Sequence, residues 1–210
     1  ITLTIILYAP MTKSTTNIIF ATPLLRVNLN NKKLVKTLIS YVKKLSKKDK
    51  QERTISNLGG RQSQILPIKD KPLVDFERFI RNHLKDFSEC YEYFNEIPRI
   101  DALWFNINKT KDANNTHNHA GVNSPDFSAV FYLQVDGGRI HFINPDPYHN
   151  CMPTLKKKDP KHWNAFNSAE YFIEPTPGDL IIFPSTINHW VEPNPSKNDR
   201  ISLAFNWSVE

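Results

Sequence analysis

Residues 116–124 read Thr-His-Asn-His-Ala-Gly-Val-Asn-Ser, and residues 177–191 read Pro-Gly-Asp-Leu-Ile-Ile-Phe-Pro-Ser-Thr-Ile-Asn-His-Trp-Val. The first stretch places His117 and His119 two positions apart, so both side chains leave one face of an extended strand. The second stretch contributes His189 from what reads as a neighbouring strand. Three imidazoles in this order predict a metal site built on a β-scaffold.

Arg200 follows His189 by 11 residues. Three imidazoles can hold one face of a mononuclear metal ion and leave positions open on the opposite side. A planar guanidinium beside them can bind a carboxylate through two parallel hydrogen bonds. We therefore expect an iron centre that also holds a dicarboxylate.

Three further segments extend this pattern. They are Phe-Ser-Ala-Val-Phe-Tyr-Leu-Gln-Val at 127–135, the turn Asp-Gly-Gly at 136–138, and Arg-Ile-Ser-Leu-Ala-Phe-Asn-Trp at 200–207. With the two histidine stretches, they make the chain resemble the 2-oxoglutarate and Fe(II)-dependent oxygenase superfamily. The resemblance is strongest to a small phage and bacterial branch related to the prolyl hydroxylases, and it covers residues 98–208.

The resemblance implies a mainly β fold, a double-stranded β-helix or jelly roll, with supporting N-terminal α-helices. It also implies a dioxygenase that uses Fe(II), 2-oxoglutarate and O2. Such an enzyme would hydroxylate a peptidyl proline, an amino acid or another small metabolite and release succinate and CO2. The resemblance implies metal binding by His117, His119 and His189 and co-substrate binding by Arg200 and Tyr132. Strand alternation places Ser202 on the same face as Arg200, where it can also bind the co-substrate, and it places Asn206 toward the same cavity as a substrate contact. Asn106, on the strand before the histidine pair, is expected to bind the co-substrate or the substrate, and Trp163 is expected to line the entrance for the substrate.

His119 departs from the pattern of most of the superfamily, which has an aspartate or glutamate at this position. A neutral imidazole in place of a carboxylate leaves the full charge on Fe(II). Three histidines also match catalytic zinc, whose fourth position carries water. In another alternative, His119 does not ligate, and water or halide takes its place, as in halogenating relatives.

From residue 100 onward the pattern is one of short strands separated by turns. The turn at 136–138 predicts a hairpin, because glycine supplies the positive φ angles that tight turns need. Segment 145–168 has no clear period and is expected to form a lid, and with 108–126 it should set specificity. The eight expected strands lie near 101–108, 115–120, 127–135, 138–144, 169–174, 179–183, 187–192 and 200–208.

The first 97 residues are expected to support a catalytic core at 98–210 within a single domain. Apolar residues at 18–29 predict a strand, and Pro23 inside it indicates an edge or bulge. A helix capped by Asn30 or Asn31 is expected over the apolar positions from 34 to 45, and another after Pro72. Residues 46–71 are expected to form a loop with one short strand.

The chain has 210 residues, of which 40% are hydrophobic, and a formal net charge of +6. Lysines cluster at 43–50 and 156–158, and we interpret these clusters as solvated faces. Neither cluster interleaves aromatic residues, so a substrate rather than a nucleic acid is the expected partner. The four other histidines are interpreted as surface residues; they are His83, His141, His149 and His162.

Two cysteines, Cys90 and Cys151, suit a reducing cytoplasm, that of a bacterium or a phage-infected host. No apolar run reaches the length of a membrane span. The apolar residues 1–10 lack a basic start and a cleavage site, so no signal peptide is predicted. Met11 is an alternative start of the native protein.

Two other classes of protein remain open at this stage. A cupin-like metal protein, either an isomerase or a zinc module, also uses a His-X-His pair in a jelly roll, but residues 120–124 lack the glutamate that cupins place there. A non-catalytic jelly-roll binding protein is the other alternative. The presence of both His189 and Arg200 favours the oxygenase over both.

Overall fold

The computed structural model describes residues 21–48, 53–92, 96–121, 124–146 and 168–210. The strands of this part form two sheets in which every pairing is antiparallel. The six-stranded sheet has the order β1-β9-β6-β11-β4-β3, and the five-stranded sheet has the order β2-β5-β10-β7-β8. The strands are β1 (Leu25–Asn28), β2 (Asn57–Leu58), β3 (Arg61–Gln62), β4 (Pro98–Asn108), β5 (Ala113–His117), β6 (Phe127–Gln134), β7 (Ile140–Ile143), β8 (Glu170–Ile173), β9 (Asp179–Pro184), β10 (His189–Val191) and β11 (Arg200–Val209).

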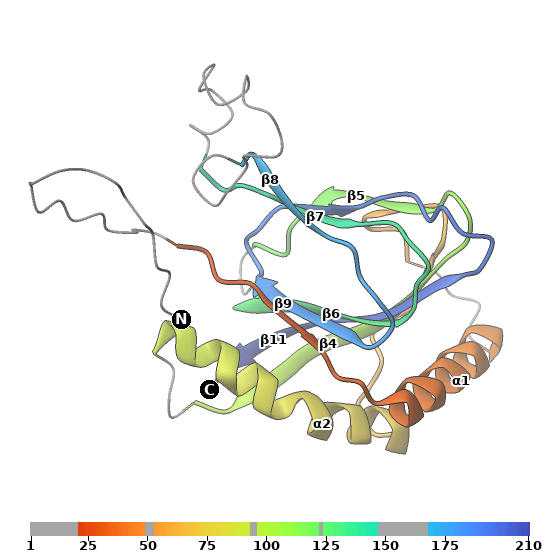
Figure 1. Cartoon of the computed structure of the whole chain (residues 1–210). Coiled ribbons are helices and arrows are strands. Elements are labelled where there is room, and N and C mark those ends of the chain that lie inside the picture. The colour runs from red at the N-terminus through yellow and green to blue at the C-terminus, as the bar shows by residue number, and fades with distance from the viewer. Residues whose placement is uncertain (1–20, 49–52, 93–95, 122–123, 147–167) are drawn as a thin grey trace, which may run out of the picture.

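The two sheets lie over each other, and the helices α1 (Lys32–Lys48) and α2 (Lys71–Ser88) cover the outer face of the six-stranded sheet (Figure 1). A short 3-10 helix, η1 (Glu89–Tyr91), follows α2. This arrangement confirms the expected jelly roll with supporting helices.

Both helices begin where the sequence indicated. The side chain of Asn31 accepts a hydrogen bond from the backbone N–H of Leu34 at 3.0 Å, which satisfies one of the free donors of the first turn of α1. Pro72 lies in the first turn of α2, where its missing N–H costs nothing. The apolar positions of each helix recur at three and four, so each has one face to bury against the sheet.

The alternation of side chains along β11 separates two environments. Residues 201, 203, 205 and 207 belong to the main hydrophobic core, where they meet the apolar faces of α1 and α2. Residues 200, 202, 204 and 206 line a cavity between the sheets. A smaller apolar core, which includes Ile140, Phe142 and Phe183, fills the rest of the space between the sheets. The site therefore lies on the inner face of a sheet whose outer face is packed against helices.

All eight strands expected after residue 100 are present, with small shifts at their ends. The hairpin prediction at 136–138 is wrong, because β6 and β7, which flank this turn, belong to different sheets. The glycine requirement itself is real, since Gly137 and Gly138 have φ angles of 90° and 83°. The turn therefore carries the chain from one sheet to the other.

The described residues of segment 46–71 contain two short strands rather than one. β2 and β3 flank a turn at Gly59 and Gly60, which both have a φ of 66°. β2 pairs with β5 of one sheet, whereas β3 pairs with β4 of the other. The turn between β2 and β3 therefore carries the chain from one sheet to the other beside the cavity.

The strand predicted at 18–29 is shorter than expected. β1 begins at Leu25, after Pro23, and lies at an edge of its sheet, as the proline indicated. Residues 1–20 lie outside the described part, as does most of the expected lid at 145–168, including Trp163.

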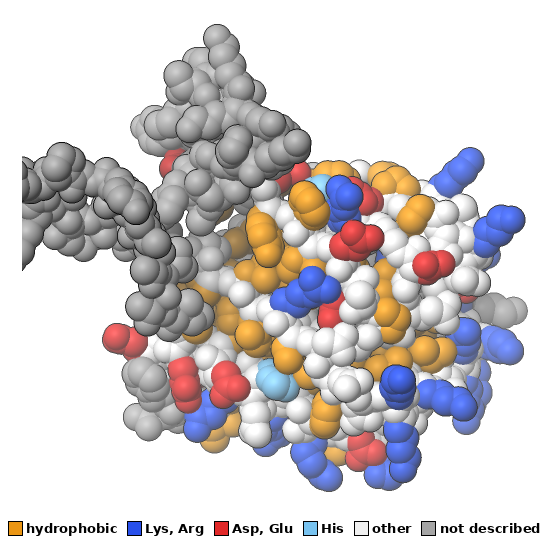
Figure 2. Space-filling model, in the orientation of Figure 1, with side chains coloured by type: hydrophobic (Ala, Val, Ile, Leu, Met, Phe, Trp, Pro, Cys, Tyr) orange, Lys and Arg blue, Asp and Glu red, His pale blue; other side chains and the backbone are white. Residues whose placement is uncertain are grey.

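The surface over α1 is basic (Figure 2), and Lys47 and Lys48 form its last turn. Positive side chains near a helix C-terminus interact favourably with the helix dipole, so this cluster has a local structural reason. Within the described residues, neither helix has the length and hydropathy of a membrane span.

Candidate metal centre

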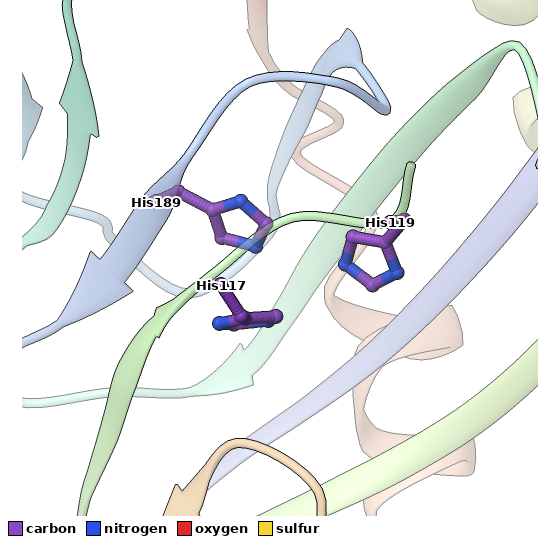
Figure 3. Close-up of side chains that lie close together, drawn as sticks. All are labelled: His117, His119 and His189. Carbon is purple, nitrogen blue, oxygen red and sulfur yellow. The ribbon is translucent and has the colours of Figure 1, made fainter. Parts of the chain in front are cut away.

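The side chains of three histidines converge beside the five-stranded sheet, next to the paired strands β5 and β10. His117 is the last residue of β5 and His189 is the first residue of β10, and the two lie directly opposite each other in the antiparallel pair. Their ring centroids are 4.2 Å apart. His119 comes from the segment just beyond β5, so the expected strand ends earlier than predicted, yet its ring turns toward the other two (Figure 3).

The three side chains can supply one ligand atom each. These atoms lie within 4.8 Å of one another. The Nδ1–H groups of His117 and His189 donate to the backbone carbonyls of Asn115 at 2.7 Å and Ile187 at 3.0 Å. Because a carbonyl only accepts, these contacts fix the proton on Nδ1 and leave the lone pair on Nε2 free to bind a metal.

The surroundings keep the imidazoles neutral, which is the form that binds metal. Burial lowers the pKa of His117. Burial, and then the charge that His117 would carry, lowers the pKa of His119 to about 4 and the pKa of His189 to about 3. At neutral pH the three imidazoles therefore need not lose a proton before they bind a divalent ion.

The segment that carries His119 is fixed to the loop before β10. The backbone N–H of His119 donates to the carbonyl of Ser185 at 2.9 Å, and the side chain of Asn118 donates to that of Asn188 at 2.9 Å. The ring of His119 is nearly parallel to that of His189, at an interplanar angle of 8° and a centroid distance of 5.4 Å. These contacts position an imidazole that no strand holds.

Arg200 lies at the start of β11 and is only 2% exposed. Its guanidinium donates to the backbone carbonyls of Glu192 at 2.9 Å and Asp112 at 3.4 Å, and it forms no ion pair with a described residue. Burial lowers the pKa of Arg200 below its ordinary value. The carboxylates of Asp112 and Glu192 stabilise this charge only from beyond ion-pair distance. A buried cation without a close counter-charge is costly, so this position fits a carboxylate ligand.

Tyr132 and Asn106 flank Ser202 on the neighbouring strands β6 and β4. Residues directly opposite in antiparallel pairs project from the same face, and all three side chains line the cavity with Arg200. Burial raises the pKa of Tyr132 to about 12, an effect that the charge of Arg200 partly offsets. Tyr132 is thus a neutral hydroxyl. Asn206 also lines the cavity, and its side chain accepts a hydrogen bond from Ser128 at 3.0 Å.

The cavity has a volume of about 300 Å³ and contains all the predicted site residues that the structure describes. Among the lining residues that the sequence interpretation missed are Arg53, Gln62, Trp104 and Asn108. The ring centroid of Trp104 is 5.9 Å from that of His119. The alternation of 104, 106 and 108 along one strand could have found Trp104 and Asn108. Arg53 and Gln62 leave no such signal, because only the pairing of β3 with β4 and the bridge between Arg53 and Gln62 bring them here.

His141 is not the surface residue expected from the sequence. It is 8% exposed and stacks on Trp190 at 4.0 Å. Its two ring nitrogens contact carboxylate oxygens of Glu170 at 3.2 Å and Glu192 at 2.9 Å. His141 does not line the cavity, so it belongs to the packing of β7, β8 and β10.

In this jelly roll, three neutral imidazoles and a buried arginine without an ion pair line one cavity. This combination is typical of mononuclear metal enzymes that bind an anionic co-substrate. The model of the family described as "Putative 2OG-Fe(II) oxygenase" matches residues 102–206. The chain belongs to this family. It is therefore an enzyme of the non-haem iron oxygenases, whose cofactor is Fe(II) and whose co-substrates are 2-oxoglutarate and O2, and the cupin-like and non-catalytic alternatives are set aside.

Solved structures show the same fold at low sequence identity. A prolyl-4-hydroxylase from Pseudomonas putida is 16% identical, with 88% of this chain and 91% of that chain covered and a TM-score of 0.64. HygX from Streptomyces hygroscopicus, solved with nickel and 2-oxoglutarate, is 12% identical, with 89% and 83% covered and a TM-score of 0.60. A viral collagen prolyl hydroxylase from Paramecium Bursaria Chlorella virus-1 is 13% identical, with 88% and 96% covered and a TM-score of 0.55. No curated protein matches the sequence.

Proposed function

We propose that the chain hydroxylates a small molecule or a peptide, with His117, His119 and His189 as the iron ligands. The observation that supports this most strongly is the convergence of three ligand atoms within 4.8 Å in a cavity that a buried arginine also lines, and this arginine forms no ion pair with a described residue. The similarity to two prolyl hydroxylases makes a peptidyl proline one candidate substrate, and amino acids and small metabolites are others.

The co-substrate has a matching set of groups. Arg200 would hold the far carboxylate of 2-oxoglutarate, since its guanidinium is buried and retains donors that backbone carbonyls do not use. Ser202 and Tyr132 would donate hydroxyl groups, and Asn106 would donate its amide from the next strand. Neutral hydroxyl and amide donors add directionality without adding charge.

When bound, Fe(II) and 2-oxoglutarate together would activate O2 for oxidation of an unactivated C–H bond, with conversion of 2-oxoglutarate to succinate and CO2. The chain itself supplies binding and orientation. His117 and His189 are held by their carbonyl partners, and Trp104 and Asn206 border the space that remains for the substrate. No protein acid or base is needed for this chemistry.

One anaerobic experiment tests the metal and co-substrate roles together. The wild type is expected to bind one Fe(II) and, with 2-oxoglutarate, to show the weak visible charge-transfer band of the chelate. His189→Ala should lose tight iron binding, because two imidazoles are a poor cage. His119→Asp restores the common superfamily set and should keep iron if His119 is a ligand.

Arg200→Leu should keep iron and weaken 2-oxoglutarate binding. Each lost hydrogen bond to a charged group is worth about 1.5–3 kcal/mol, or roughly tenfold to a hundredfold in affinity. Arg200→Lys should recover part of this loss, since it restores charge without the planar fork. Stoichiometric iron in His189→Ala, or a 2-oxoglutarate titration unchanged in Arg200→Leu, would remove the respective residue from the site.

A further inference from the structure

Arg53 is a second arginine that lines the cavity. It precedes β2, and its backbone N–H donates to the carbonyl of Gln62 at 3.1 Å. Its side chain is partly buried, and within the described residues its guanidinium has no hydrogen bond or ion pair. A cation without an acidic partner beside a cavity fits an anionic ligand.

The position of Arg53 follows from a row of paired residues across the six-stranded sheet. Arg53 lies opposite Gln62, Gln62 opposite Asn106, Asn106 opposite Ser202, and Ser202 opposite Tyr132. All five line the cavity, so they form one polar row along its floor. Adjacent strands are about 4.8 Å apart, which places the backbone of Arg53 about 14 Å from that of Ser202. The row therefore begins at the proposed co-substrate site and ends at Arg53.

Gln62 lies between these two ends. Its residue is 5% exposed and its side-chain amide forms no hydrogen bond with a described residue. The amide atoms themselves are not sealed off from solvent, so they are open to the cavity and can pair with a polar ligand group. Gln62 and Arg53 together offer one neutral and one charged donor to the same ligand.

The wall beside Arg53 is apolar. Ile55 and Ile65 line the cavity, although they are 61% and 54% exposed, and Trp104, whose ring centroid is 5.9 Å from that of His119, lines it as well. Large exposed aliphatic side chains at the entrance to a cavity mark a surface that a ligand covers. An apolar surface next to a single cation is suited to a molecule that carries both features.

We propose that the substrate is a compact organic acid with an apolar body, and that Arg53 and Gln62 bind its carboxylate while Ile55, Ile65 and Trp104 contact the apolar body. The identity of this molecule as a substrate rests on the proposed function. The carboxylate can belong to a free acid or to the C-terminus of a peptide. Arg53 is then a specificity residue, and its distance from Ser202 separates it from the group that holds 2-oxoglutarate.

The test uses a matched pair of probes, N-acetyl-L-leucine and N-acetyl-L-leucinamide, which differ in charge but hardly in shape. Binding is measured on the full metal-free chain by ligand-observed NMR and by tryptophan fluorescence, so that the result does not depend on iron binding. The wild type should bind the acid on the order of tenfold more tightly than the amide. Arg53→Gln should remove this preference, and Arg53→Lys should keep part of it. Arg81→Gln, on the exposed face of α2, should leave it unchanged.

Each outcome decides the proposal. Equal binding of acid and amide to the wild type, no binding of either, or a preference that survives in Arg53→Gln overturns it. Loss of 2-oxoglutarate affinity in Arg53→Gln also overturns it, because Arg53 would then belong to the co-substrate site. A tripeptide ending in leucine, with a free or amidated terminus, identifies the carboxylate source, since its preference should match that of N-acetyl-leucine only if the site accepts a chain end.

Discussion

At the scale of single residues, the three histidines owe their metal-binding form to burial rather than to a counter-charge. No carboxylate of the described residues contacts their rings, and backbone carbonyls fix the proton position of His117 and His189. A protonated imidazole in this group would meet two others at ring distances of 4.2 to 5.4 Å. The site therefore disfavours protonation of the three imidazoles and leaves their lone pairs available to a metal cation.

This property predicts a pH dependence of the free energy of unfolding in the metal-free protein. The pKa values of His119 and His189 fall from 6.5 to about 4 and about 3 on folding. Below pH 6.5 the unfolded chain takes up protons that the folded chain refuses, so stability is full above that pH and is lost as pH falls toward these values. Urea unfolding between pH 4 and 8 should show this slope, and His189→Gln should make it shallower. An identical slope in both proteins would contradict the assignment.

The site residues divide into those that the sequence could predict and those that it could not. The histidines and Arg200 stand in local motifs whose spacing maps onto strand geometry. Gln62 and Arg53 stand in a polar segment without periodicity, and their place depends on two short strands that pair with different sheets. The burial of His141 could not be predicted either, because it depends on residues distant in sequence, among them Glu170 and Glu192, which contact its ring nitrogens.

At the scale of elements, the turn between β6 and β7 has an effect on Arg200. Gly138 has a φ of 83°, and a Cβ built at this position would lie 2.6 Å from Nη1 of Arg200. The sequence correctly predicted a positive φ angle for the glycines of this turn. It wrongly predicted that the two flanking strands pair with each other. Alternating hydrophobicity identifies a strand, whereas the sheet that it joins depends on contacts far along the chain.

Gly138→Ala is expected to destabilise the protein by about 1–2 kcal/mol, the cost of a left-handed conformation for a residue with a Cβ. It should also weaken 2-oxoglutarate binding, because the guanidinium of Arg200 must move. Urea unfolding and the 2-oxoglutarate titration measure the two effects.

Gly121→Ala is the matched control. Apart from its chain neighbours, no atom of the described residues lies within 4 Å of its added Cβ, so both quantities should stay at the wild-type values. A Gly138→Ala variant that loses stability but binds 2-oxoglutarate normally would show that the turn does not position Arg200.

At the scale of the whole molecule, one hydrophobic core contains side chains from both helices and from β4, β6, β9 and β11. Phe76 of α2 is fully buried, and its ring stacks on Phe131 at 5.2 Å and meets Phe205 edge-on at 5.8 Å. We propose that the helices and the jelly roll fold as one cooperative unit, because neither buries its apolar face without the other.

Phe76→Ala should therefore lower the free energy of unfolding of the whole chain by about 3–5 kcal/mol. The same helix provides the control, since Phe79 is 39% exposed, and Phe79→Ala should cost less than about 1 kcal/mol. Chemical denaturation followed by far-UV and near-UV circular dichroism should give coincident transitions. Separate transitions for helix and sheet signals would show two units.

The alternation along β11 has a consequence for how this gene can change. The side chains encoded by codons 201, 203, 205 and 207 are packed in the core, so we expect selection to remove most substitutions at these positions. The codons between them encode cavity-lining side chains, and beyond Arg200 and Ser202 these are Ala204 and Asn206. Selection thus acts on the strand in two interleaved registers, and a lineage can acquire a new substrate through every second codon while its fold stays constant.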